Sequence, residues 1–306
     1  MSLRFALIAA AIGAAVGAVE GRQAKPLRDP RVFRSAVELT SITATVRDQD
    51  GRLVTGLTRD AFEIYEDGVR QEITQFTNER VPVSLAVLLD ISDSMYGRRI
   101  DDARTAVSTF LADLLDPGDE FIVVAFNHQP YFLSWWTRER TRLTTMLEPI
   151  RPSGGTAIYD AVLAAIPQFT VRNNQRGALV IISDGADTAS DATLREVRRA
   201  LFRTDAFAYA VAIDSAERQA INTRVNPVAL QEITDTSGGR TEVVHGTDDL
   251  VPAIARIAEE LNSQYLLGYT SAVGADGAFH SIRVRVTGQD YRVRARNGYV
   301  APARDN

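Results

Sequence analysis

The stretch VPVSLAVLLDISDSMYGRR, residues 81–99, changes character within one residue. A run of aliphatic side chains stops at Asp90, and oxygen-bearing side chains then stand at alternate positions, at Asp90, Ser92 and Ser94. In an extended chain, alternate positions place their side chains on one side of the strand. A buried strand that ends in this way indicates a cation site, a nucleophile or a helix cap, and these residues alone do not choose among the three.

Short apolar runs of the same kind recur further along the chain and alternate with stretches of helical periodicity. The runs are VSLAVLLD (83–90), EFIVVAFN (120–127), GALVIISDG (177–185) and AFAYAVAID (206–214). Runs of this length and composition are typical of strands buried on both faces. The expected helices cover 101–115, 158–169, 191–202 and 248–261. We therefore predict an α/β fold over residues 81–263, a doubly wound, mostly parallel sheet flanked by helices.

The segments before and after this region, 36–80 and 264–300, read as β-structure. Asp50-Gly51 and Asp67-Gly68 each separate two runs of alternating residues, which is the signal of a tight hairpin. A further turn is expected at 288–290. Because the termini of a domain usually lie close together, we expect the two segments to pair into one small antiparallel domain that carries the α/β region as an insertion.

The N-terminus indicates export. A short basic end is followed by an unbroken apolar stretch, residues 5–19, and then by small residues. This pattern predicts a secretory signal peptide over residues 1–24, with cleavage after Ala18 or Ala24 as options, because the apolar stretch is too short for a membrane span. An uncleaved anchor or a buried apolar helix is the alternative. We expect a mature protein without a membrane span, in the periplasm or outside the cell.

The composition excludes several kinds of chemistry. The chain has 306 residues, no cysteine and a single lysine, Lys25. Thiolate zinc sites, thiol catalysis and disulfides are therefore excluded, as are a P-loop lysine and a Schiff-base lysine in the folded part. The net charge of −5 gives no support to nucleic-acid binding.

Three polar clusters fall where predicted elements meet the carboxyl edge of the sheet, the edge at which open α/β sheets bind ligands. They lie in DISDS (90–94), PSGGTAIYDAV (152–162) and IISDGADT (181–188). Their donors are two carboxylates and three hydroxyls: Asp90, Asp184, Ser92, Ser94 and Thr156. These hard oxygen ligands suit Mg²⁺, Mn²⁺ or Ca²⁺ rather than zinc or copper. Mg²⁺ would retain water and an open position, which a carboxylate from a partner could fill.

In chain order, the motifs Asp90-x-Ser92-x-Ser94, Gly154-Gly155-Thr156 and Ser183-Asp184-Gly185 resemble the metal-ion-dependent adhesion site of von Willebrand factor type A (vWA) domains. The similarity spans residues 82–262. The flanking stretches resemble a bacterial branch of exported proteins related to this family: GLTRDAFEIYEDGVRQEI (56–73), QYLLGY (264–269) and VRARNGYV (293–300).

The resemblance implies a role for each donor. Ser92 and Ser94 would bind the metal directly, Thr156 directly or through water, and Asp90 and Asp184 through water or by hydrogen bonding. An aspartate or glutamate of a protein partner would complete the coordination. The resemblance thus implies a non-enzymatic protein-binding module with a role in adhesion or assembly. The alternative is a structural subunit of an envelope assembly with a vestigial, metal-free site.

One residue departs from the family pattern. Asp93 stands between the two serines, where the family often has glycine. Its carboxylate would either add charge at the edge of the site or obstruct the carboxylate of a partner.

Two enzymatic alternatives fit the sequence less well. A haloacid-dehalogenase nucleophile at Asp90 would need a second aspartate where Ser92 stands and a lysine that the α/β region lacks. A serine hydrolase would need a G-x-S-x-G elbow, which is absent. The three histidines, His128, His245 and His280, are scattered singly and are expected to be ordinary loop or surface residues.

Three further features have structural explanations that we prefer. Asp187 and Asp191 could form a second cation site, but we expect Asp191 to cap the next helix. Of Trp135 and Trp136, one should lie in the core and the other be exposed. Five arginines at alternate positions predict an exposed strand face that is solvated or paired with acids such as Glu63 and Glu66: Arg283, Arg285, Arg292, Arg294 and Arg296.

Overall fold

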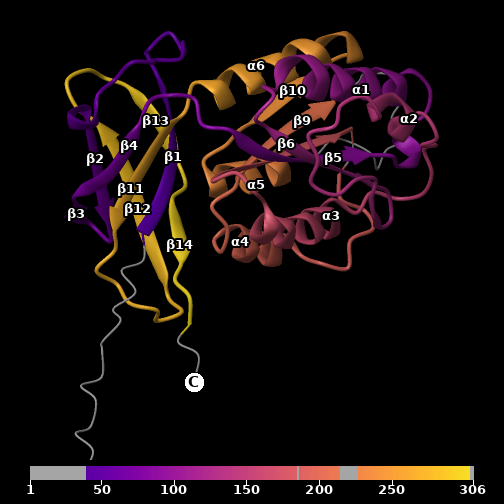
Figure 1. Ribbon diagram of the computed structural model, residues 1–306. Coiled ribbons are helices and arrows are strands. Elements are labelled where there is room, and N and C mark those ends of the chain that lie inside the picture. The colour runs from indigo at the N-terminus through magenta and orange to yellow at the C-terminus, as the bar shows by residue number, and fades with distance from the viewer. Residues whose placement is uncertain (1–38, 185, 214–226, 304–306) are drawn as a thin grey trace, which may run out of the picture. The chain divides into compact units, whose positions relative to one another are not determined.

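The structure is a computed structural model that describes residues 39–184, 186–213 and 227–303 (Figure 1). The chain divides into two compact units, 1–36 and 37–306, and the described residues all belong to the second. The expected signal peptide lies outside the described residues. Within them, no helix combines the length and the apolar character needed to cross a membrane.

The α/β region is built on a six-stranded sheet with the strand order β10-β9-β8-β5-β6-β7. The strands are β5 (Val83–Asp90), β6 (Glu120–Phe126), β7 (Pro130–Phe132), β8 (Arg176–Ser183), β9 (Phe207–Ile213) and β10 (Thr241–Val244). All neighbours are parallel except β7, which pairs antiparallel with β6 at the edge. The predicted doubly wound, mostly parallel sheet is therefore confirmed.

Helices cover both faces of this sheet (Figure 1). One face carries α1 (Arg98–Thr109), α2 (Leu143–Leu147) and α6 (Leu250–Asn262), and the other carries α3 (Ile158–Ala165), α4 (Leu194–Leu201) and α5 (Pro227–Ser237). Alternate residues of β5 enter the two cores: Leu85 and Leu89 face α1 and α6, whereas Leu88 faces α3. Because both faces are covered, every residue of β5 is buried.

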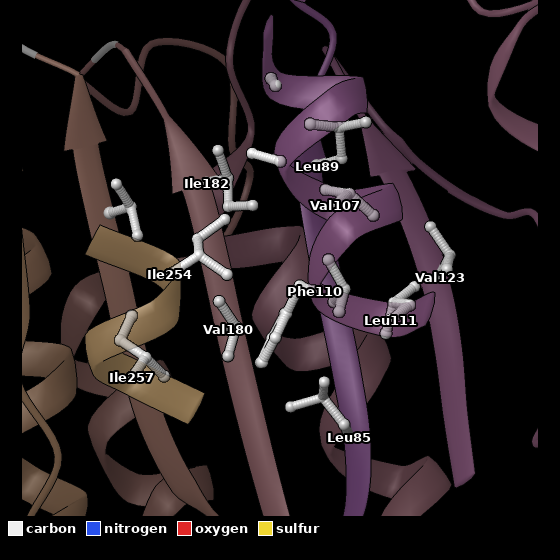
Figure 2. Close-up of a cluster of buried hydrophobic side chains, with 14 of the residues drawn as sticks. Leu85, Leu89, Val107, Phe110, Leu111, Val123, Val180, Ile182, Ile254 and Ile257 are labelled. Atoms are coloured by element: carbon white, nitrogen blue, oxygen red, sulfur yellow. The ribbon is translucent and has the colours of Figure 1, made fainter. Parts of the chain in front are cut away.

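Figure 2 shows the core between the sheet and the first group of helices. Val107 of α1 and Phe110, the first residue of the π-helical turn Phe110–Leu114, point at the sheet, as do Ile254 and Ile257 of α6. All four side chains are almost completely buried. Burial of a large apolar side chain contributes about 1.5–3 kcal/mol, so this layer is a main source of the region's stability.

Helix α4 begins later than the sequence analysis predicted. Its N-cap is Thr193, whose hydroxyl accepts a hydrogen bond from the Glu196 N–H, while the Glu196 carboxylate accepts one from the Thr193 N–H. This is a capping box. The expectation that Asp191 caps the helix was therefore wrong, and the Asp191 N–H instead donates to Asp160 Oδ2.

The flanking segments form two four-stranded antiparallel sheets, ordered β13-β1-β11-β4 and β14-β12-β2-β3. The strands are β1 (Leu39–Arg47), β2 (Phe62–Glu66), β3 (Val69–Gln71), β4 (Ile73–Thr77), β11 (Tyr265–Thr270), β12 (Phe279–Val286), β13 (Arg292–Ala295) and β14 (Gly298–Val300). Strands from before the α/β region pair with strands from after it, β1 with β11 and β13 and β2 with β12. Their inner faces share one apolar core.

The two Asp-Gly turns differ. Asp67 and Gly68 both have positive φ, 48° and 82°, as a two-residue type I′ hairpin requires, and they join β2 to β3. At the other turn only Gly51 has positive φ, and the chain beyond it makes a single bridge, Arg47 to Leu53. The predicted hairpin between two strands is confirmed at Asp67-Gly68. At Asp50-Gly51 the chain also turns back antiparallel, and the Val54 N–H donates to the Val46 carbonyl at 2.9 Å, but the returning segment makes a bridge rather than a full strand.

The arginine-rich strands do not form one exposed face. Arg283, Arg285 and Arg292 are exposed, but Arg294 and Arg296 are partly buried. The three exposed arginines agree with the expected solvated face. The two acids named as alternative partners make other contacts: Glu66 is buried and accepts hydrogen bonds from Tyr269, Ser271 and Tyr299, while Glu63 pairs with Arg70.

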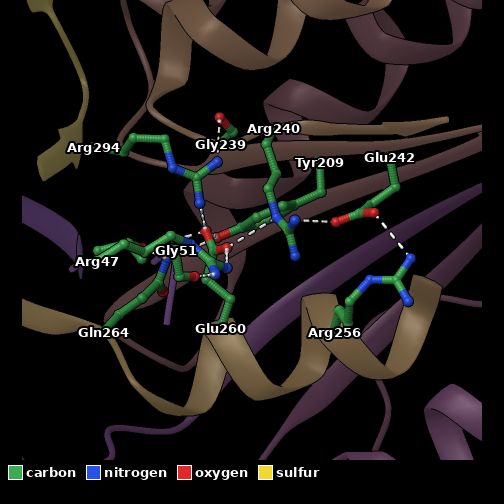
Figure 3. A network of polar contacts seen from close by, with 11 residues as sticks. Arg47, Gly51, Tyr209, Gly239, Arg240, Glu242, Arg256, Glu260, Gln264 and Arg294 are labelled. Atoms are coloured by element: carbon green, nitrogen blue, oxygen red, sulfur yellow. Dashed lines mark hydrogen bonds and ion pairs between the residues drawn. The ribbon is translucent and has the colours of Figure 1, made fainter. Parts of the chain in front are cut away.

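Arg294 instead belongs to a polar cluster around Glu260 of α6, shown in Figure 3. The Glu260 carboxylate is completely buried and pairs with Arg47 of β1 at 2.8 Å, with Arg240 at 3.0 Å and with Arg294 of β13. The Tyr209 hydroxyl of β9 donates to it at 3.0 Å. One carboxylate thus links the last helix of the α/β region to two strands of the antiparallel part.

The two tryptophans divide as predicted. Trp136 packs against Phe169, and its indole N–H donates to the Gln168 carbonyl at 3.0 Å. Trp135 is 67% exposed and stacks on Phe132. Trp136 is thus a core residue, and Trp135 an exposed one.

Candidate functional site

The loop after β5 is attached directly to the loop before α3. The Asp93 N–H donates to the Gly154 carbonyl at 2.9 Å, and the Ser153 N–H donates to the Ile91 carbonyl at 2.8 Å. Gly154 has a φ of +76°, which is left-handed backbone that favours glycine. These bonds fix the loop of Ser92 and Ser94 against the loop of Thr156.

The loop after β8 is attached to the same neighbour. The Thr156 carbonyl accepts hydrogen bonds from the N–H groups of Thr188 and Ala189, at 2.8 and 3.0 Å. A Cβ atom on Gly155 would lie 2.9 Å from the Ala189 Cβ, so glycine is needed for this close approach. The three loops predicted to share one edge of the sheet therefore lie together.

Four of the five predicted donors form a continuous chain of hydrogen bonds. The Asp90 Oδ1 atom accepts from the Ser92 N–H at 2.8 Å, and the Ser92 and Ser94 hydroxyl oxygens lie 2.9 Å apart. The Ser94 hydroxyl donates to Asp184 Oδ1 at 2.6 Å. The Ser183 hydroxyl donates to Asp90 Oδ2 at 2.5 Å. Side chains about ninety residues apart in sequence are thus in direct contact.

The hydrogen bonds of Thr156 to the neighbouring loop are made by its backbone. It is buried, and its N–H donates to the Thr188 hydroxyl at 3.0 Å. Its own hydroxyl makes no hydrogen bond to another described residue. The structure therefore places Thr156 in the loop next to Ser92 and Ser94 without joining its side chain to their hydrogen-bond chain.

Both carboxylates are difficult to ionise in this environment. Asp90 is completely buried, and burial raises its pKa to about 7 despite the hydrogen bonds from Ser183 and Ser92. Burial also raises the pKa of Asp184, although Ser94 and Arg99 offset part of the effect. A positive charge next to these two groups would stabilise their ionised forms.

Arg99 already supplies one such charge, and the sequence analysis did not identify it. Its Nη1 atom donates to Asp184 Oδ2 at 2.8 Å and to the Ser94 carbonyl at 2.7 Å. A signal was present, because Arg98 and Arg99 occupy the first turn of α1, where the helix dipole favours anions rather than cations.

Of the three neighbouring aspartates, Asp187 has a role in the fold. Asp187 Oδ2 accepts hydrogen bonds from the Tyr159 N–H at the start of α3 and from the Ser190 hydroxyl, while Asp191 and Asp93 are exposed. Among the described residues, no three or more His, Cys, Asp and Glu side chains gather as a metal-binding group. A cation at this edge would therefore depend on the serine and threonine hydroxyls.

His280 is buried in β12, so the expectation of an ordinary loop or surface histidine was wrong for this residue. Its ring Nδ1 lies 2.7 Å from Asp67 Oδ2, and its Nε2 lies 3.2 Å from Asp276 Oδ1. Both contacts are within the antiparallel part of the chain, away from the three loops.

Comparison with known proteins identifies the class of the α/β region. Residues 85–186 match the family described as von Willebrand factor type A domain, and the matched stretch contains all five candidate donors. The fold agrees: a von Willebrand factor type A protein from Catenulispora acidiphila superposes with a TM-score of 0.52 at 14% identity, over 79% of this chain and 74% of that chain. The α/β region thus has the vWA fold, and residues 85–186 match the vWA family.

Two further relatives resemble parts of the chain. Inter-alpha-trypsin inhibitor heavy chain H2 of Sus scrofa is 29% identical over 134 residues, which are 39% of this chain. This chain spans only 14% of the length of that relative. An aerotolerance-related membrane protein from Bacteroides fragilis NCTC 9343 with multiple mutations to serines has a TM-score of 0.51 at 22% identity, over 59% of this chain and 98% of that chain.

Proposed function

We propose that the protein is an exported, non-enzymatic binding module whose vWA domain holds Mg²⁺ or Mn²⁺ and recruits an acidic side chain of a protein partner. The observation that carries the proposal is the hydrogen-bonded chain Asp90, Ser92, Ser94 and Asp184 at the carboxyl edge of the sheet. Hydroxyl and carboxylate oxygens are the donors that Mg²⁺ and Mn²⁺ prefer.

The donors fit a hard cation for a second reason. Burial raises the pKa of Asp90 to about 7, so a cation next to it would stabilise its ionised form. Ser92 and Ser183 already donate hydrogen bonds to its two oxygens. Ser92, Ser94 and Thr156 would hold the ion, while Asp90 and Asp184 would balance its charge. When bound, the ion supplies an electrophilic position for a carboxylate oxygen of the partner, and this binding requires no covalent step.

A thermal unfolding experiment tests the metal part of the proposal. A ligand that binds the native state raises the melting temperature by mass action. We expect Mg²⁺ or Mn²⁺ to raise the melting temperature over that in EDTA, and Ser94→Ala to abolish the increase. Asp191→Ala is the control, because this exposed carboxylate lies on the same loop as Asp184 but outside the donor chain. No increase for the parent protein would reject the metal.

A pull-down from envelope extract tests the partner. We expect at least one protein to be recovered with Mg²⁺ and lost with EDTA or with Ser94→Ala. Recovery of every partner regardless of metal would instead favour the structural subunit with a vestigial site.

A further inference from the structure

The first turn of α1 carries two adjacent arginines that differ in their surroundings. The Arg98 side chain is 82% exposed, and its nearest carboxylates, those of Asp102 and Asp248, lie 3.9 and 3.7 Å away. The Arg99 side chain is 20% exposed and lies 2.8 Å from Asp184, which is itself almost completely buried. Of the two arginines, Arg99 therefore has the shorter and more buried contact with a carboxylate, and this carboxylate belongs to the candidate site.

Arg99 contacts the candidate metal site at two points. It donates to Asp184 Oδ2, while Asp184 Oδ1 accepts from the Ser94 hydroxyl. It also donates to the backbone carbonyl of Ser94. Asp184 is thus satisfied on both oxygens by neighbouring residues, and one of the two bonds comes from a full positive charge.

We infer that Arg99 is an internal counter-cation of the metal site, which compensates Asp184 when no metal is bound and competes with the metal for that carboxylate. This inference rests on the proposed function and adds a regulatory element to the same site. A buried carboxylate without a counter-charge is costly, so Arg99 stabilises the metal-free protein. The contact between Arg99 and Asp184 must weaken or rearrange when Asp184 interacts with a divalent ion. This lowers the apparent affinity of the site for the metal.

The competition makes the site a sensor of divalent-ion concentration. At low concentration, the guanidinium holds Asp184 and Ser94 in the hydrogen-bonded arrangement seen here. At high concentration, the ion takes over the charge balance and opens a position for the partner. A ligand shifts an equilibrium between two states only by the difference in its affinity for them. Here the states are the metal-free site, held by Arg99, and the metal-bound site, and the contact of Arg99 with Asp184 sets the difference.

Calorimetric titration with Mg²⁺ and with Mn²⁺ tests the inference, comparing the parent protein with Arg99→Gln and Arg98→Gln. We expect Arg99→Gln to bind metal about ten-fold more tightly, which corresponds to about 1.4 kcal/mol. Arg98→Gln removes the same charge from the same turn without touching Asp184, so any general electrostatic effect of that charge appears there too. We expect less than a two-fold change for this control.

A second measurement reports on the metal-free state. In EDTA, Arg99→Gln should melt at a lower temperature than the parent and Arg98→Gln, and saturating Mg²⁺ should remove most of that difference.

The outcomes separate the two proposals. Metal binding of equal or lower strength in Arg99→Gln would overturn this inference and leave the proposed function standing. Absence of metal binding in all three proteins would overturn both.

Discussion

Replacing Glu260 with glutamine should be strongly destabilising, because this single carboxylate compensates a cluster of arginines. It is completely buried, pairs with Arg47 at 2.8 Å and Arg240 at 3.0 Å, and also pairs with Arg294 (Figure 3). Glutamine keeps the shape and one acceptor oxygen but removes the charge. Breaking a buried ion pair by removing one partner costs about 3–5 kcal/mol. We expect a loss near the lower end, about 3 kcal/mol, because all three arginines retain some exposure to water.

The pH dependence of this effect has a definite sign. Burial alone would raise the pKa of Glu260, but the charges of Arg294 and Arg240 and the hydrogen bond from Arg47 outweigh it and hold the pKa below the ordinary 4.5. A carboxyl group with a lowered pKa in the folded state stabilises the fold above its unfolded pKa and loses this contribution as the pH falls through its folded pKa. The difference between parent and Glu260→Gln should therefore be full at pH 7 and shrink below pH 4.5.

Urea-induced unfolding followed by circular dichroism measures the difference in free energy. Glu259→Gln is the matched control, because it changes the adjacent, exposed residue of the same helix and should alter stability by no more than about 0.5 kcal/mol. A loss below about 1 kcal/mol for Glu260→Gln would show that the arginines do not depend on this charge.

Three further predictions follow from other parts of the fold. Phe110→Ala should cost about 3–5 kcal/mol in urea unfolding, because the ring is completely buried between α1 and the sheet. Thr193→Ala should cost about 1 kcal/mol by the same assay, since it removes the N-cap that pairs with Glu196. The hydrogen bond to Asp67 raises the pKa of His280 above 6.5. The stability of the parent relative to His280→Asn should therefore be greatest below pH 6.5 and should fall as the pH rises through the folded pKa. A stability difference that grows with pH would contradict this sign.

The four central strands of the sheet, β9, β8, β5 and β6, could be predicted because each is a continuous apolar run, whereas the short edge strands β7 and β10 were not predicted. The strand β5 is buried on both faces, so its apolar run is continuous, and its end at Asp90 is marked by an abrupt change to polar residues. The convergence of the three loops could be predicted for a related reason: parallel strands bring their carboxyl ends to one edge, so loops far apart in sequence meet there.

The partners of Arg99 and Glu260 could not be predicted because packing sets them, although the position of Arg99 in the first turn of α1 was a signal that it has a special role. Arg99 contacts a carboxylate 85 residues away, and Arg47 lies 213 residues from Glu260. No local pattern encodes such distances. The N-cap of α4, in contrast, could have been predicted, because Thr193-x-x-Glu196 is a capping-box signature visible in the sequence. The prediction placed the start of the helix at Asp191 and therefore chose Asp191 as the cap.

Electron paramagnetic resonance of Mn²⁺ is the sharpest test of the proposed metal site, because it measures the free ions separately from the bound ions. We expect one ion bound per chain in the parent protein and in Asp191→Ala, and none in the double variant Ser92→Ala, Ser94→Ala under the same conditions. Binding that persists in the double variant, or no bound ion in the parent protein, would contradict the proposal.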